Sequence, residues 1–180
     1  SPSVDPHTHV YTTTGVLDSK FGFSMETGHA AEAVRQAVKA PNLDLVGLHF
    51  HLGSPIFELE PYAIAIDTVL TFASELRNEG LELREFSPGG GFAIGYVMSQ
   101  LPPPVSDYAD VICSVVKSRC AALGLDEPKL IIEPGRAIVG RAGVALYTVG
   151  AIKEIPGVRN TSRAAAWATR FDIPTTKRSR

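Results

Sequence analysis

The sequence is poor in sulfur, has no strong excess of either charge and has no long apolar run. Its two cysteines, Cys113 and Cys120, lie seven residues apart in a helical pattern. This spacing is a rise of about 10 Å, which is too long for a disulfide between them but places both on one helix face. We therefore expect two reduced thiols on a buried face and a cytoplasmic location.

The small net charge and the lack of a long apolar run exclude two classes of partner. A net charge of −2 provides no basic surface for nucleic acid. No apolar run approaches the roughly 20 residues that cross a bilayer, so we expect no membrane partner. With 44% hydrophobic residues over 180 positions, the chain can build one sizeable core. The composition therefore favours a protein that acts on small molecules.

The stretch LVGLHFHLGS at residues 45–54 is the centre of the sequence. Read as a strand, it places its large apolar residues on one face and the imidazoles of His49 and His51 on the other. It ends at Gly53 and Ser54, whose backbone amides and hydroxyl could hold an anion. An apolar face toward helices and polar groups at the carboxyl end are what an enzymatic β/α barrel requires.

Two further predicted strands, at residues 83–86 and 129–132, also end in residues suited to binding. The first leads into Gly89–Gly91, whose bare amides would let a phosphate approach closely, although a flexible turn explains such a triplet about as often. The second leads into the sequence EPGR at residues 133–136, a carboxylate and a guanidinium held by a rigid turn. The alternative for this turn is a surface loop with a local ion pair.

Apolar stripes with helical spacing separate these strands and continue the alternation of strand and helix. Ser106 is expected to cap the last of the three helices. Residues 19–23 suggest a short strand before the first helix, and residues 143–155 alternate like a half-exposed antiparallel strand. The predicted helices are residues 27–39, a long helix with its stripe from Tyr62 to Leu76 that ends at Gly80, and a helix that ends at Gly124.

The motifs HFHLGS, PGGGF and EPGR, in this order, resemble those of the pyridoxal-phosphate decarboxylases with the alanine-racemase-like barrel fold. The early stretch DPHTHVYTTTG followed by SKFGF is similar to the family members that act on diaminopimelate. The resemblance implies an α/β fold in which residues 1–140 are the later part of a (β/α)8 TIM barrel and residues 141–158 begin a β domain. It also implies pyridoxal 5'-phosphate as cofactor and decarboxylation of meso-diaminopimelate to L-lysine.

The resemblance assigns a role to each candidate residue. His51 would stack on the pyridine ring, and Glu133 would face the pyridine nitrogen and keep it protonated; these two are the expected catalytic residues. Arg136 would also reach the amino-acid substrate, and no metal is implied. The expected phosphate-binding residues are Ser54, Gly89, Gly90, Gly91, Gly135 and Arg136.

Two departures from the family pattern concern the rest of the site. Pro55 stands where the family commonly has Gln, which removes an amide donor beside the phosphate. The family's Schiff-base lysine lies on the first barrel strand, which we expect to precede Ser1. Lys20 is the alternative lysine, although a structural cation is the favoured interpretation. We therefore expect a truncated piece, inactive alone, of an enzyme whose full-length relatives are homodimers.

Two other functions stay open on the sequence. His49 and His51 could be the ligand pair of a metal-dependent barrel hydrolase, which would need further ligands at other strand ends. His7 and His9 form a second HxH pair, in a predicted loop. A chain without the lysine could instead be a non-catalytic homologue that binds pyridoxal phosphate.

The tail, residues 159–180, does not continue the family pattern. From Asn160 onward it holds five basic residues and one acid, Asp172, without strand alternation. We expect it to be disordered or the product of a frameshift. One choice of codons for residues 164–180 reads in a second frame as GGMGDSIRHPYYEAQS, which is similar to the segment that the family has here.

Overall fold

The computed structural model describes residues 1–4, 21–96, 101–144, 146, 148–153, 161–164 and 173–174. The chain divides into two compact units, Ser1–Arg141 and Ala142–Arg180. The predicted candidates His7, His9 and Lys20 lie outside the described residues.

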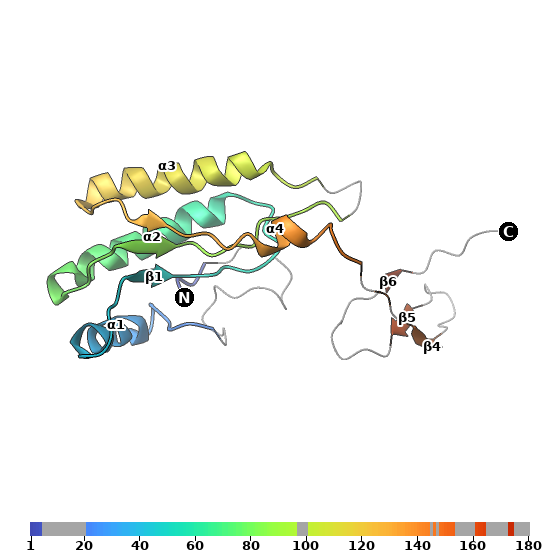
Figure 1. The fold of residues 1–180 in the computed structure, drawn as a ribbon, viewed down its shortest axis with the longest axis horizontal. Coiled ribbons are helices and arrows are strands. Elements are labelled where there is room, and N and C mark those ends of the chain that lie inside the picture. The colour runs from blue at the N-terminus through green and yellow to red at the C-terminus, as the bar shows by residue number, and fades with distance from the viewer. Residues whose placement is uncertain are drawn as a thin grey trace. The chain divides into compact units, whose positions relative to one another are not determined.

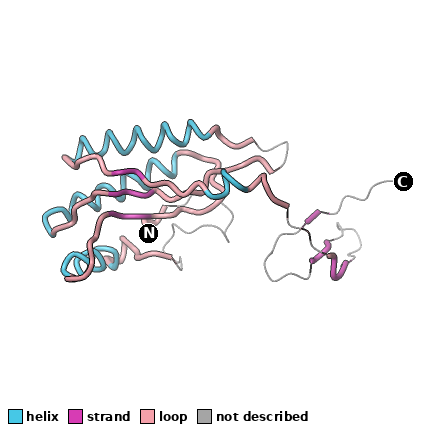
Figure 2. Tube along the Cα trace, viewed as in Figure 1, coloured by secondary structure: helices cyan, strands magenta, loops and turns pink. Residues whose placement is uncertain are grey.

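The first unit contains a three-stranded parallel sheet in which the strands lie side by side in chain order. These strands are shorter than the predicted stretches, and the second one ends one residue later than predicted. Isolated parallel bridges, Ile56 to Phe92 and Gly90 to Glu133, continue the pairing beyond the strands, and the loops run on toward the same end of the unit (Figure 2). The strands are β1 (Gly47–His49), β2 (Glu85–Ser87) and β3 (Lys129–Leu130).

Helices alternate with the strands, so that the order along this unit is helix, strand, helix, strand, helix, strand, helix, with a 3-10 turn after the second helix (Figure 1). The second and third helices pack against each other, and the first packs beside the second through Val34, Ala73 and Leu76. The unit is therefore an α/β structure whose three long helices form one layer. The helices are α1 (His29–Lys39), α2 (Glu60–Leu76) followed by the 3-10 turn η1 (Arg77–Glu79), α3 (Val105–Leu123) and α4 (Gly135–Val139).

The predicted alternation around β1 is confirmed. Phe50 and Leu52 are 4% and 0% exposed in the core beneath the helices, whereas His49 is exposed on the other side. Burying an aliphatic side chain of this size contributes about 2 kcal/mol to stability. The predicted stripe of α2 is buried in full, and it consists of Tyr62, Ile66, Val69, Ala73 and Leu76.

Both predicted glycine caps are confirmed, since Gly80 and Gly124 have φ of 100° and 65° at the ends of η1 and α3. The prediction that Ser106 caps α3 was wrong. Pro104, with φ −56° and ψ 149°, is the N-cap residue, and Ser106 lies in the first turn with its hydroxyl donating to Asp107 at 3.2 Å. The fixed φ of proline sets this boundary, and no side-chain oxygen is needed for it.

Two other local predictions differ from the structure. Phe21 to Phe23 form no strand, because Gly22 has φ 70° and bends the chain. Cys120 is buried as predicted but Cys113 is exposed, and both are free. The buried positions of α3 recur every four residues rather than every 3.6, so the buried stripe drifts around the helix and leaves Cys113 outside it.

The second unit contains an antiparallel sheet of three strands, β4 (Val149–Lys153), β5 (Thr161–Ala164) and β6 (Ile173–Pro174). β4 lies inside the stretch predicted as a strand. β5 and β6 form in the tail, where the sequence shows no alternation, because strand pairing can override local pattern. The other residues after Lys153 lie outside the described residues, and the frameshift stays a prediction.

No helix in the described part of the chain is long and apolar enough to span a membrane.

The burial of Leu52 generates a test of this core. Leu52→Ala should lower the free energy of unfolding by about 3 kcal/mol, because it leaves a cavity under the helices. Leu43→Ala, at a leucine that is 65% exposed, is the matched control and should change it by less than about 0.5 kcal/mol. Denaturant unfolding measures both. Equal effects of the two variants would contradict the assignment of Leu52 to the core.

Candidate active site

Three segments that are far apart in the sequence meet at the carboxyl ends of the strands. The amide of Phe50 donates to the Ser87 carbonyl oxygen at 3.0 Å, and the amide of Glu133 donates to the Gly89 carbonyl oxygen at 2.9 Å. The amide of Gly90 donates to His51 Nδ1 at 3.4 Å. The two residues predicted to be catalytic, His51 and Glu133, therefore flank the glycine triplet.

The glycine triplet is packed against backbone on both sides. A Cβ on Gly89 would lie 2.6 Å from the Phe50 carbonyl oxygen, and a Cβ on Gly90 would lie 1.8 Å from the Glu133 carbonyl oxygen. A Cβ on Gly91 would lie 2.2 Å from the Gly53 carbonyl oxygen. Such distances exclude any side chain, so these glycines permit the close approach of neighbouring loops. Their predicted phosphate contacts are a separate property and stay a prediction.

Burial sets the charge state of His51. Desolvation lowers the pKa of the imidazole below its ordinary value. The Glu133 carboxylate acts in the opposite direction, and the neighbouring His49 adds to the lowering. A neutral imidazole that accepts a hydrogen bond at Nδ1 presents a flat aromatic face, which fits an aromatic ring of a cofactor.

The segment after β3 places Arg136 beside Ser54. α4 begins at Gly135, so the first amides of this helix have no carbonyl partner within it. Arg136 Nε donates to Ser54 Oγ at 2.8 Å, and its Nη1 donates to the hydroxyl of Tyr96. The guanidinium carbon also lies 5.6 Å from the centre of the Tyr96 ring.

The interpretation of EPGR as a local ion pair is wrong, since Glu133 pairs toward His49 and Arg136 toward Ser54.

Two tyrosines beneath the sheet hold these loops from the helix side. Tyr62 on α2 donates to the Gly90 carbonyl oxygen at 2.6 Å, and Tyr108 on α3 donates to the Ile56 carbonyl oxygen at 2.6 Å. Their rings meet edge to face, with centres 5.9 Å apart. Burial raises the pKa of Tyr62 above its ordinary value, so its hydroxyl remains a donor. The sequence predicts Tyr62 on a helix stripe but neither of these two hydrogen bonds.

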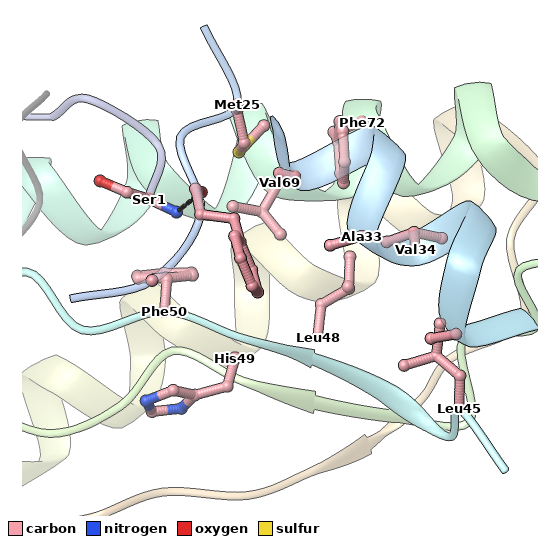
Figure 3. A pocket seen from close by; sticks show the side chains of 14 residues that line it. Ser1, Met25, Ala33, Val34, Leu45, Leu48, His49, Phe50, Val69 and Phe72 are labelled. Carbon is pink, nitrogen blue, oxygen red and sulfur yellow. Dashed lines mark hydrogen bonds between the residues drawn. The ribbon is translucent and has the colours of Figure 1, made fainter. Parts of the chain in front are cut away.

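An apolar pocket of about 290 Å³ lies between β1, α1 and α2. In Figure 3, Leu48 points from β1 toward the helices, whereas the His49 ring points away from them. His49 thus joins His51 and Glu133 on the polar face of the sheet. It approaches Glu133, with 3.8 Å between Nε2 and Oε2, and Ser87, with 2.9 Å between Nδ1 and Oγ.

Ser87 was missed by the sequence analysis. A signal existed, since it is the polar residue between Phe86 and the glycine loop, and aligning the ends of the strands places it opposite His49.

For the metal alternative, the described residues contain no group of three or more His, Cys, Asp or Glu side chains that could hold an ion. His49 and His51 have different partners instead.

The electrostatics of His51 generate a prediction that NMR titration can test. Its midpoint should lie below the ordinary value of 6.5, because burial disfavours the imidazolium. Glu133→Gln should lower the midpoint further by removing a negative charge, and His49→Gln should raise it, because the protonated form of His49 disfavours a second positive charge beside it. A midpoint at or above 6.5, or shifts of the opposite sign, would contradict this environment.

Comparisons with known proteins show the family of this chain. Residues 1–140 match the family model described as pyridoxal-dependent decarboxylase, pyridoxal binding domain. The diaminopimelate decarboxylase of Halalkalibacterium halodurans is 41% identical over 161 residues, which cover 89% of this chain and 37% of that protein. The Bacillus subtilis enzyme of the same name is 39% identical over 160 residues, 88% of this chain and 36% of that protein. The chain thus spans little more than a third of the length of these relatives.

Solved structures give the same result. Diaminopimelate decarboxylase from Helicobacter pylori, complexed with L-lysine, has a TM-score of 0.69 and 33% identity, covering 85% of this chain and 36% of that one. The M. jannaschii enzyme in complex with L-lysine has a TM-score of 0.70 and 35% identity, covering 88% and 36%. The resemblance found in the sequence motifs is confirmed, and the chain belongs to the pyridoxal-dependent decarboxylase family.

Proposed function

We propose that this chain supplies the cofactor-binding part of an enzyme that decarboxylates meso-diaminopimelate to L-lysine with pyridoxal 5'-phosphate. The observation that carries the proposal is the meeting of His51, the glycine loop and Glu133 at one end of the sheet. The relatives named diaminopimelate decarboxylase and the L-lysine in two of the structures support this substrate class.

The residues present fit the cofactor. The Glu133 carboxylate would hold a proton on the pyridine nitrogen, since an adjacent negative charge raises the pKa of a cation. The neutral His51 face would orient the ring. Ser54, with Arg136 and the first amides of α4, would hold the phosphate, although Pro55 adds no amide donor there. When bound, the cofactor supplies the electron sink for the carbanion that loss of carbon dioxide creates.

The proposal includes a partial (β/α)8 barrel. Parallel strands in chain order, with their connecting helices in one layer, agree with a sector of a barrel. A doubly wound sheet would reverse its strand order and place helices on both faces. The polar face with His49, His51 and Glu133 would then line the inside, where barrel enzymes bind substrate at the carboxyl ends of the strands.

Three further expectations belong to the same proposal, namely homodimers of the whole enzyme, a cytoplasmic location and the domain boundaries near residues 140 and 158. The roles of Gly135 and of Arg136 toward the substrate also rest on the resemblance.

The metal-hydrolase alternative would require stoichiometric zinc in the purified protein. The non-catalytic alternative would leave pyridoxal phosphate bound to the full-length gene product without a lysine adduct after borohydride reduction, which mass spectrometry detects.

Cofactor binding tests the proposed site. The 180-residue chain should bind pyridoxal phosphate, followed by absorbance, and Glu133→Gln should weaken binding about tenfold by removing the charge opposite the ring nitrogen. Glu127→Gln changes an exposed carboxylate just before β3, at the other end of the strand, and should leave the affinity unchanged. Equal affinities of all three proteins would contradict the role of Glu133.

The reaction itself is tested with the full-length gene product. It should release carbon dioxide from meso-diaminopimelate and form L-lysine, whereas Glu133→Gln should lower kcat at least about a hundredfold. Release from L-ornithine but not from meso-diaminopimelate would overturn the proposed substrate.

A further inference from the structure

Hydrogen bonds connect the glycine loop to His49 through Ser87. Ser87 is 8% exposed and lies opposite His49 in the register of β1 and β2. Its Oγ accepts from the Gly89 amide at 3.3 Å and lies 2.9 Å from His49 Nδ1. The Ser87 hydroxyl has one hydrogen and a second lone pair, so it can donate to Nδ1 or accept from it, depending on the tautomer of His49. A buried hydroxyl needs such a partner.

The Glu133 carboxylate near Nε2 favours the direction in which Ser87 donates, and this direction decides which nitrogen of a neutral His49 carries the proton. A neutral imidazole that accepts at Nδ1 must carry its proton on Nε2. His49 Nε2 lies 3.8 Å from Oε2 of Glu133, so an N–H there is oriented toward a negative charge. The other tautomer would place a lone pair against the carboxylate and would leave the Ser87 hydroxyl without an acceptor at Nδ1.

We propose that His49 is a positioning residue for Glu133, and that Ser87 holds it in the tautomer whose Nε2–H faces the Glu133 carboxylate. The proposal deepens the proposed function and rests on it, because Glu133 is there the partner of the pyridine nitrogen. A donor at its oxygen favours the ionised carboxylate and restricts its orientation. With the cofactor bound, an ionised Glu133 would keep a proton on the pyridine nitrogen.

The present distance fits a contact that strengthens on binding. At 3.8 Å the two groups are beyond a normal hydrogen bond, and their side chains are 50% and 58% exposed. Water therefore weakens the interaction in this state. A group bound against this face excludes water, and contacts of this kind commonly shorten in the bound complex.

The first test reads the tautomer directly and needs no cofactor. Long-range nitrogen NMR of the full 180-residue chain should show His49 with its proton on Nε2. Ser87→Ala should convert it to a mixture of tautomers. Ser118→Ala removes a hydroxyl from α3 that donates to the Val115 carbonyl oxygen, and it should leave the tautomer unchanged. A proton on Nδ1 in the parent chain, or no change in Ser87→Ala, would overturn the proposal.

The second test separates a donor from a mere space filler. Gln at position 49 can present an amide N–H near the place of Nε2, whereas Leu cannot. His49→Leu should weaken binding of pyridoxal phosphate about fivefold, and His49→Gln should stay within about twofold of the parent. Circular dichroism checks that both variants fold.

Equal affinity of the Leu and Gln variants would overturn the positioning role. If the parent chain bound no pyridoxal phosphate, the proposed function would fail by itself. The tautomer experiment would then still decide whether Ser87 orients His49 toward Glu133.

Discussion

The approach of three backbones around a run of three glycines is the constraint on which the site depends. Gly90 pairs with Glu133 in a parallel bridge, and the carbonyl oxygens of Phe50, Glu133 and Gly53 occupy the space where side chains would begin. With the loops this close, the imidazole that follows β1 and the carboxylate that follows β3 lie on either side of the glycine loop. The chemistry proposed for the site therefore depends first on backbone packing and only then on charge.

The helices take part in this arrangement because they support the loops from below. The hydroxyls of Tyr62 and Tyr108 reach through the core to carbonyl oxygens of the glycine loop and of the segment after β1. Each ring is also part of the apolar cluster that holds Leu52 and Phe86. Core packing and site geometry are thus coupled, since a buried hydroxyl without an acceptor would cost stability. The polar face, in contrast, remains accessible for a ligand.

The sequence predicted those features that follow from local periodicity and chemistry. The alternation around His49 and His51, the stripe of α2 and the caps at Gly80 and Gly124 all needed only residue spacing. The combination of motifs was enough to identify the family. The predicted strand lengths and the predicted start of α3 were wrong, because tertiary pairing sets the strand lengths and Pro104 sets the start of the helix. The partnership of Ser87 with His49 depends on the register between β1 and β2, which no single segment determines.

The glycine triplet shows why a motif alone was insufficient. Glycine is required both where a phosphate binds bare amides and where a neighbouring backbone packs closely. The structure supplies evidence for the close packing, which the motif alone does not reveal. The most direct measurement is the free energy of unfolding of Gly90→Ala, beside Gly143→Ala, where nothing lies within 4 Å of the added carbon. We expect a loss of about 3 kcal/mol for Gly90→Ala and almost none for Gly143→Ala. Equal stabilities would show that the loops do not meet as described.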